Sequence, residues 1–396
     1  MSLLDKASLI VTPNSYKTSK LYSVIPNTTL GDMDVVRATT ATRVNASSLI
    51  ESVGLNIPRI DYTNGSCPSL LVEPQRTNLV TYSEQFNDAS WVKSIGGTGV
   101  VASVVSNAGV SPSGLQDADL ITLNSGTGTT PSDQAKVLKN ISGLTTGVSY
   151  SESIWLKGVN GGEQVLLGIS NIGTLKATLT TEWKRFVLTG ISGGTFNSVG
   201  VQIRRGLFEP LNSYAQFYAW GSQLEAGSYP TSYIPTVAST VTRNADVISK
   251  TGISSLIGTT YTVYGEIINE GIHNARHLAL KLPTGGNYTD VVFIVQNFNG
   301  LQATANNSTS TAQFTINSGS YSIGQTLKYA LRCEQNNVAF YINGVQIGVD
   351  TLCTIPVVST LYLGTYVDLQ LGSKIKSTMI FPSALTNTEL AQLTTL

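Results

Sequence analysis

Residues 217–236 read FYAWGSQLEAGSYPTSYIPT, and the rest of the chain can be organised around them. Aromatic residues favour a pleated, half-buried surface, so we predict a strand from Tyr214 to Leu224. Gly221 interrupts the alternation of side chains and indicates a β-bulge or a close backbone approach. Pro230 and Pro235 remove amide donors and fix φ, so the sheet cannot continue through them. The stretch therefore predicts a β domain that ends in a stiff, extended connector, with another β domain after it.

Composition sets limits on the class of protein. The chain has 396 residues, of which 41% are hydrophobic and only 12% charged, and it carries 37 glycines. This length predicts two or three domains, and the low charge favours many short strands and turns. The formal net charge is zero, so we expect neither a nucleic-acid partner nor a polybasic membrane patch. The chain also lacks an apolar run of about twenty residues, so no membrane insertion is expected.

Short alternating runs, separated by Gly, Asn and Ser turns, fall into two sets. Residues 78–236 predict an antiparallel β-sandwich of jelly-roll type, and residues 237–396 predict a second β-sandwich. In the second set, Asn343-Gly344 between apolar residues indicates a hairpin, because a type I′ turn needs φ > 0 twice. The chain closes with a short helix, in which Thr386 and Glu389 form a capping box. The predicted fold class is therefore all-β, with two sandwiches in tandem.

Residues 1–77 do not read as a domain that can stand alone. The segment has few large apolar residues, and prolines punctuate its second half. A segment this short usually needs another surface to complete it. It is either an extension packed on its own domain or a segment that docks to a neighbouring subunit or particle. Its first residues lack the charged end and apolar core of a signal peptide, so we expect synthesis in a cytoplasm.

Two motifs resemble segments of bacteriophage tail and fibre proteins. One runs from Trp220 through Ile234-Pro235-Thr236 to residues 241–246, VTRNAD; the other comprises residues 56–62 and 70–79. In those proteins the first motif joins a carbohydrate-binding-like jelly roll to a concanavalin A-like (laminin-G-like) module. The hairpin at residues 340–347, the strand to Phe381 and the closing helix resemble the latter module.

The resemblance implies a tail or head fibre protein that is exposed on the virion. Such a protein would be made in the bacterial cytoplasm, attach to other virion proteins through residues 1–77 and assemble as a homotrimer. It would bind host cell-surface polysaccharide. The resemblance favours docking over a packed extension for the N-terminal segment.

Counting side chains with a period of two predicts one polar, aromatic face on the first sandwich. A flat ring can stack on the C–H bonds of a neutral sugar, while amides and guanidinium groups read its hydroxyls. The alternative is that these rings belong to the core, where aromatic residues are more often found. The candidate glycan-binding residues are Trp155, Gln202, Arg204, Tyr214, Gln216, Tyr218 and Trp220.

Candidate chemistry beyond this face is sparse. Asp117 and Asp119 lie two apart at a predicted loop–strand edge and could hold a structural calcium ion with nearby carbonyls. Calcium needs six or more oxygens, so this metal site is weakly indicated, and no cofactor is expected. A polysaccharide-degrading spike would need paired acids and a long repetitive shaft, and neither is recognisable. We therefore expect a non-enzymatic glycan-binding protein; the alternative is a structural head fibre or capsid decoration protein without a sugar site.

Overall fold

The computed structural model confirms the all-β class. It describes residues 2–63, 65–168, 171–206, 213–271, 274–282, 286–297, 300–364 and 372–395. Antiparallel strands dominate these residues, and their one α-helix is α1 (Asn387–Thr395) at the C-terminal end. The chain divides into two compact units, each with its own core. Unit 1 consists of Met1–Ser48, Ser52–Gln75 and Asn244–Leu396, and unit 2 consists of Leu49–Glu51 and Arg76–Arg243.

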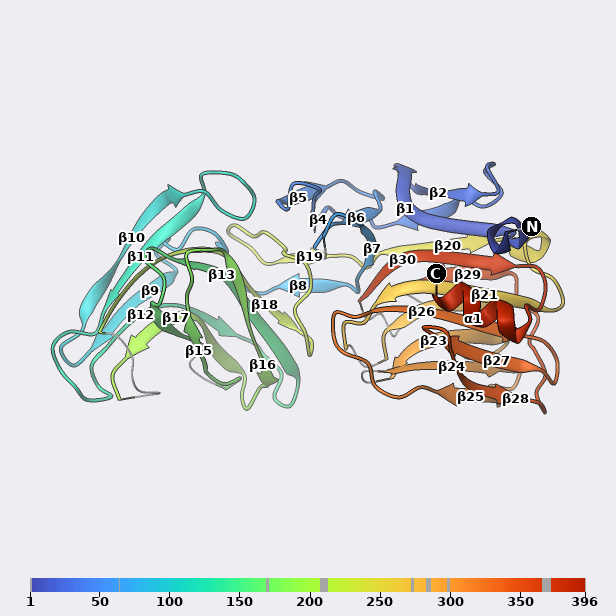
Figure 1. Ribbon diagram of the computed structural model, residues 1–396. Helices are drawn as coiled ribbons and strands as arrows, with labels where there is room; N and C mark the ends of the chain where they lie inside the picture. Colours follow the sequence, from blue (N-terminus) through green and yellow to red (C-terminus); the bar gives the residue numbers. More distant parts are fainter. Residues whose placement is uncertain are drawn as a thin grey trace. The chain divides into compact units, whose positions relative to one another are not determined.

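Unit 2 is a sandwich of two five-stranded sheets (Figure 1). The sheet that carries the aromatic strand has the order β10-β11-β18-β13-β16, and the other has the order β15-β14-β17-β12-β9. A short pair, β8 with β19, closes the unit. Its strands are β8 (Arg76–Asn78), β9 (Trp91–Gly96), β10 (Val100–Gly109), β11 (Ala118–Asn124), β12 (Gln134–Ser142), β13 (Ser149–Gly158), β14 (Gln164–Leu167), β15 (Leu175–Thr178), β16 (Lys184–Ile191), β17 (Phe196–Arg204), β18 (Tyr214–Ala226) and β19 (Val241–Arg243).

The core of unit 2 follows the alternation read from the sequence. Ile154 and Leu156 of β13 point inward, as does Phe217 of β18, and they meet Val201 and Ile203 of β17 in one apolar cluster. Because successive side chains of a strand point to opposite faces, the residues between them form the outer faces of the two sheets.

Gly221 forms the predicted bulge in β18. Ser153 pairs with Gln223 and Trp155 with Trp220, so β18 has one more residue than β13 between these two pairs. Gly221 has φ = +64°, and a Cβ there would lie 3.0 Å from the Trp155 ring. Glycine adopts this left-handed conformation readily, and a bulge redirects the side chains beside it.

The proline-containing connector packs back on unit 2. The strand ends at Ala226, and Tyr233 and Ile234 beyond it are buried. Ile234 N donates to Gln223 Oε1 over 2.7 Å, and Asn78 Nδ2 donates to the Ile234 carbonyl over 2.9 Å. The connector is thus held by buried hydrogen bonds to its own unit.

Unit 1 is built on one 16-stranded sheet. Its main path is β25-β24-β23-β22-β29-β20-β3-β2-β1-β30-β21-β26-β27-β28, and β7 adds to β30. Strands from distant parts of this path, such as β21 and β22, contribute to a single core, so the sheet folds over as a sandwich.

The bounds of the unit 1 elements fall into an N-terminal and a C-terminal group. The N-terminal group is η1 (Leu3–Lys6), β1 (Leu9–Lys17), β2 (Lys20–Ile25), β3 (Met33–Val36), β4 (Ala41–Val44), β5 (Ile50–Val53, which begins in unit 2), β6 (Arg59–Asp61) and β7 (Ser69–Val72). The C-terminal group is β20 (Val247–Thr251), η2 (Ile253–Ser255), β21 (Tyr261–Ile268), β22 (Arg276–Lys281), β23 (Val291–Asn297), β24 (Gly300–Asn306), β25 (Ala312–Asn317), β26 (Thr326–Cys333), β27 (Val338–Ile342), β28 (Val345–Asp350), β29 (Thr360–Leu363), β30 (Ser373–Phe381) and α1.

The structure corrects the prediction of a separate segment at residues 1–77. Strand β1 pairs with β30, and β3 pairs with β20, so the N-terminal strands lie in the middle of the unit 1 sheet (Figure 1). Leu9, Leu21 and Met33 are fully buried in its core. The few apolar residues of this segment suffice because β3, β2 and β1 are inserted as a group between β20 and β30, which residues beyond 244 supply. The packed extension is therefore the correct alternative for these strands.

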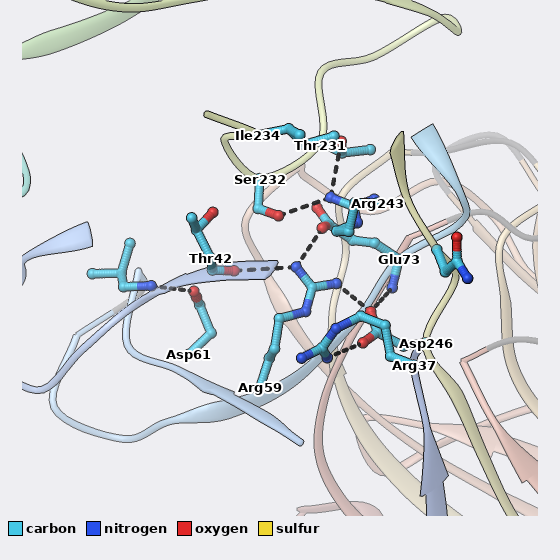
Figure 2. Close-up of polar contacts among 12 residues, drawn as sticks. Arg37, Thr42, Arg59, Asp61, Glu73, Thr231, Ser232, Ile234, Arg243 and Asp246 are labelled. Carbon is cyan, nitrogen blue, oxygen red and sulfur yellow. Dashed lines mark hydrogen bonds and ion pairs between the residues drawn. The ribbon is translucent and has the colours of Figure 1, made fainter. Parts of the chain in front are cut away.

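A buried ion-pair cluster joins the two parts of unit 1 (Figure 2). Asp246 accepts from Arg37 Nη1 over 2.8 Å and also from Arg59 Nη2, while Arg59 Nη1 lies 2.6 Å from Glu73 Oε2. The two arginine side chains are fully buried. Burial disfavours the charged form of Arg59, yet Asp246 and Glu73 outweigh it and raise its pKa. Burial lowers the pKa of Arg37, against the attraction of Asp246.

Two local predictions in unit 1 are confirmed. Asn343 and Gly344 connect β27 and β28 with φ values of +48° and +81°, as a type I′ hairpin requires. At the closing helix, Thr386 N donates to Glu389 Oε2 over 2.8 Å and Glu389 N to Thr386 Oγ1 over 3.3 Å. These reciprocal bonds are the capping box.

Candidate functional site

The strongest candidate surface is the outer face of β18 and β13 in unit 2. Tyr214, Gln216 and Tyr218 follow one another at a spacing of two, opposite the inward-facing Phe217. Tyr214 is 50% exposed, and the other two are half-buried. Lys157 of β13 stands opposite Tyr218, with Nζ 6.0 Å from its ring centre. We call these four residues the outer strip.

The polar groups of the outer strip are held in place by their neighbours. Gln216 Nε2 donates to Thr122 Oγ1 of β11 over 3.1 Å, which orients the amide. The Tyr218 ring packs on Gly109, where a Cβ would approach it to 2.7 Å. A glycine at that position lets the ring lie flat against β10.

An aromatic cluster continues the outer strip along the sheet. The Trp155 and Trp220 ring centres are 5.5 Å apart, and Tyr233 lies 5.6 Å from Trp155 and 4.6 Å from Trp220. Trp220 and Tyr233 are buried, whereas Trp155 and Trp183 are half-buried. The cluster is therefore mainly a second, smaller core that supports the outer face.

Arg185 covers part of this cluster. Its guanidinium carbon lies 4.4 Å from the Trp155 ring centre, within cation–π range. Nη1 donates to the Thr231 carbonyl over 2.8 Å, and Nη2 donates to Ser153 Oγ over 2.9 Å. The guanidinium thus covers one face of the half-buried Trp155 ring, and Trp155 serves mainly to support the outer face.

The structure separates the seven residues predicted to share one face. Trp155, Tyr214, Gln216, Tyr218 and Trp220 lie together on the outer face of the β10-β11-β18-β13-β16 sheet. Gln202 and Arg204 lie on β17, on the outer face of the other sheet. The prediction that all seven residues share a single concave surface is therefore wrong. Alternation assigns a residue to the inside or the outside, but it does not say which sheet the strand joins.

Gln202 and Arg204 have structural environments of their own. Gln202 is only 1% exposed and pairs with Lys136 and Leu166 of the neighbouring strands. Arg204 is half-buried, and its Nε donates to the Pro131 carbonyl over 2.7 Å.

The weak calcium candidate is engaged in protein contacts. Asp119 is buried and accepts from the backbone amides of Phe86 over 2.8 Å and Asn107 over 3.0 Å. Burial raises its pKa, against those amide hydrogen bonds. Asp117 accepts a 3.4 Å hydrogen bond from Ser113. Across the described ranges, no group of three or more His, Cys, Asp or Glu residues is arranged to hold a metal ion.

The candidate residues predicted from the sequence leave out three contributors to this face. Tyr233 falls in the predicted connector, Lys157 alternates to the same side of its strand as Trp155 without being a candidate, and Arg185 is not predicted to belong to the face. The aromatic residue between two prolines was a usable signal for Tyr233. The roles of Lys157 and Arg185 depend on the pairing of β13 with β18 and β16, which alternation within one strand does not reveal.

Glu152 has a buried carboxyl group in unit 2, with few hydrogen bonds to offset its loss of hydration. It is fully buried on β13, and its Oε1 accepts from Gly200 N over 2.8 Å. Oε2 has no hydrogen-bond partner within the described part of the chain. Burial raises the pKa of Glu152 to about 8, against the Gly200 hydrogen bond. Burying the ionised carboxylate costs free energy, so the charge state of Glu152 affects the stability of unit 2.

Comparisons with known proteins identify distant structural neighbours. No protein-family model matches the chain, and no curated protein matches it by sequence. The CBM40 of the Ruminococcus gnavus IT-sialidase, bound to alpha2,3 sialyllactose, is 15% identical, with a TM-score of 0.31 over 35% of this chain and 84% of that one. Domain 4 of AbnA, a GH43 arabinanase from Geobacillus stearothermophilus in complex with arabinotriose, is 16% identical, with a TM-score of 0.30 over 42% and 83%.

A third neighbour is the receptor-binding domain of botulinum neurotoxin C/D mosaic serotype. It is 13% identical, with a TM-score of 0.31 over 38% of this chain and 40% of that chain. TM-scores near 0.3 do not establish a function for this chain. In the residues that the structure describes, no helix has the length and apolar character needed to span a membrane.

Proposed function

We propose that this protein is a virion fibre or appendage protein of a bacteriophage that binds host cell-surface glycan without cleaving it. The phage assignment rests on the sequence motifs at residues 56–79 and 220–246. The binding assignment rests on one observation, the outward-facing row formed by Tyr214, Gln216 and Tyr218. The protein would be made in the host cytoplasm and displayed on the particle.

The outer strip has the groups that a sugar requires. Two tyrosine rings offer apolar faces for C–H bonds and phenolic hydroxyls for hydrogen bonding. The Gln216 amide and the Lys157 ammonium can read hydroxyl groups between them. Tyr218 packs against the adjoining aromatic cluster, and Thr122 holds the Gln216 amide, so these two side chains lose little entropy on binding.

A glycan array of host surface polysaccharides tests the proposal with the full chain. We expect Tyr214→Ala to weaken binding roughly two- to tenfold, because an aromatic contact contributes about 0.5–1.5 kcal/mol. Phe196→Ala is the matched control, since Phe196 is 43% exposed on the other sheet of the same unit. Failure to bind any host polysaccharide, or equal loss in both variants, would contradict the proposal.

A structural role, as a head fibre or decoration protein, is the second candidate. The edge strand β10 exposes Val100, Val101 and Val105, each more than half accessible. Exposed apolar edge strands pair readily with other chains. Analytical ultracentrifugation of Val101→Lys and Val105→Lys variants separates the roles: loss of a homotrimer with glycan binding intact places these valines in assembly.

Attachment to other virion proteins is proposed to use the exposed surface of the N-terminal residues. The η1 turn has no buried residue, whereas β1 to β3 are integral to the unit 1 sheet. Deleting residues 2–6 should therefore impair incorporation into particles while leaving the fold intact. Purification of particles followed by immunoblotting measures how much of the protein is incorporated.

A further inference from the structure

The hairpin β1–β2 of unit 1 contains an irregularity that the proposed function does not use. Val11 pairs with Ser23 and Tyr16 pairs with Leu21. Residues 12–15 of β1 therefore stand opposite Tyr22 alone, and they bulge out of the ladder. Pro13 has no amide hydrogen for the ladder, which accounts for the break. Bulges redirect side chains and are common beside functional sites.

A hollow of about 500 Å³ lies beside this bulge. Its lining includes Asn14, Tyr16, Arg43, Asn45, Tyr62 and Pro68, all within unit 1. Asn14 also lines a second hollow of about 550 Å³, which is bounded by Tyr22 and Asn27. Both volumes fall in the range of small-molecule sites. The bulge thus forms a wall shared by two hollows.

The polar and aromatic groups of the first hollow are preorganised. Arg43 Nη2 donates to Tyr16 Oη over 3.2 Å, and the guanidinium lies 5.7 Å from the Tyr16 ring centre. Tyr62 packs against the core of unit 1, which fixes its ring. Asn45 Oδ1 accepts from Ser47 N over 2.9 Å, which orients its amide. Side chains locked in this way lose little entropy when a ligand binds.

We propose that this hollow of unit 1 binds a pyranose unit of a glycan, between the rings of Tyr16 and Tyr62. The rings face the C–H bonds of the sugar, while Asn14, Asn45 and Arg43 hydrogen-bond its hydroxyl or carboxylate oxygens. The mixture of two aromatic rings, two amides and a guanidinium matches a polar ligand with an apolar face. The neighbouring hollow extends the site to a second sugar unit past Asn14.

This site goes beyond the outer strip because it belongs to the other unit and shares no residue with it. Two sites of modest affinity on one chain, multiplied in a homotrimer, would raise avidity for a repeating polysaccharide by orders of magnitude. The two sites can be removed separately, so failure of one inference is distinguishable from failure of the other.

The test uses the full chain, an array of neutral and uronic-acid oligosaccharides, and saturation-transfer NMR on the best-bound oligosaccharide. We expect Tyr16→Ala and Arg43→Gln each to reduce binding to that oligosaccharide at least fivefold in the background of Tyr214→Ala, which weakens binding at the outer strip. Tyr288→Ala is the matched control, because Tyr288 is a 41% exposed tyrosine of unit 1 that lines neither hollow. Thermal unfolding of each variant checks that the fold is retained.

Arg43→Lys separates the two kinds of sugar. Retained binding with lysine indicates a carboxylate-bearing sugar, since a point charge suffices, whereas loss indicates hydroxyl recognition by the planar guanidinium. Either result supports the site if Arg43→Gln and Tyr16→Ala bind weakly. Unchanged binding in Tyr16→Ala and Arg43→Gln, or no binding to any oligosaccharide in the Tyr214→Ala background, overturns it.

Discussion

Asp246 of unit 1 and Glu152 of unit 2 are buried acidic side chains with opposite surroundings. In unit 1, Asp246 and Glu73 are buried against two arginines that neutralise them. In unit 2, Glu152 is buried and accepts from the Gly200 amide, and its second oxygen has no hydrogen-bond partner among the described residues. A buried charge is tolerated either when it is paired and hydrogen-bonded or when it takes up a proton. Asp246 follows the first route and Glu152 the second.

This difference matches how each unit is assembled from the chain. Unit 2 is almost continuous in sequence, and its sheets form around one alternating core. Unit 1 combines residues from both ends of the chain, and its ion-pair cluster links Arg37 and Arg59 to Asp246 across that gap. A buried ion pair is weak evidence for a net gain in stability. It does require its two charged groups to come together, because either charge left buried alone is strongly destabilising. We infer that the cluster fixes the register of the N-terminal strands.

The largest expected effect tests the cluster. Asp246→Asn leaves Arg37 buried without its carboxylate partner, so we expect unit 1 to lose about 3–5 kcal/mol of unfolding free energy. All four tryptophans of the chain lie in unit 2. Urea denaturation should therefore show an earlier transition by far-UV circular dichroism, with the tryptophan fluorescence transition unchanged.

Asp34→Asn is the matched control for the cluster. Asp34 pairs with Lys20 on unit 1, and their side chains are 47% and 34% exposed. Exposed ion pairs contribute roughly 0–1 kcal/mol, so this variant should unfold close to the wild type. Equal destabilisation by the two substitutions would remove the distinction between a buried cluster and a surface pair.

The second effect concerns the pH dependence of unit 2. The pKa of Glu152 is raised from 4.5 to about 8 in the folded state, so folding favours its protonated form. Its contribution to stability is complete below pH 4.5 and is lost as the pH rises toward 8. We expect Glu152→Gln to unfold like the wild type near pH 4 and to be more stable at pH 9, by an amount on the order of a few kcal/mol.

Tryptophan fluorescence during urea denaturation at pH 4 and pH 9 measures this difference. Glu182→Gln serves as the control, because Glu182 is an exposed glutamate of the same unit. A constant difference between Glu152→Gln and the wild type over this pH range would show that Glu152 does not titrate in the folded protein.

The smallest effect tests the bulge that supports the aromatic cluster. Gly221→Ala places a Cβ 3.0 Å from the Trp155 ring at φ = +64°, whereas Gly143→Ala at φ = +79° meets no atom within 4 Å. We expect a cost of about 2 kcal/mol for Gly221→Ala and about 1 kcal/mol for Gly143→Ala, since both are strained and only the first also crowds a ring. Only Gly221→Ala should change the near-UV circular dichroism of the tryptophans; equal spectra would contradict the role of the bulge.

Much of the fold follows from local sequence signals. The strand beginning at Tyr214, the Gly221 bulge, the Asn343-Gly344 turn and the Thr386 capping box each depend on residues a few positions apart. Such interactions are encoded within the element itself, so one sequence suffices to predict them. The inward positions of Phe217 and Ile154 follow from alternation in the same way.

The candidate site was predicted only in part. Alternation placed Tyr214, Gln216 and Tyr218 on one outer row, and the structure keeps them there. It also grouped Gln202 with them, and that grouping fails because β17 belongs to the other sheet. The hollow beside Tyr16 depends on Arg43 and Tyr62 from separate elements, and no signal in the sequence connects them.

The sequence by itself determined that this protein is a chain of short strands in two sandwich units, with side chains assigned to inside or outside. Only the tertiary structure decided that most of the first 75 residues, including β1 to β3, complete the last sandwich, and which outward-facing residues meet. The physical reason is that alternation is a property of a single strand, whereas strand pairing and buried ion pairs such as Arg37 with Asp246 join residues about two hundred positions apart.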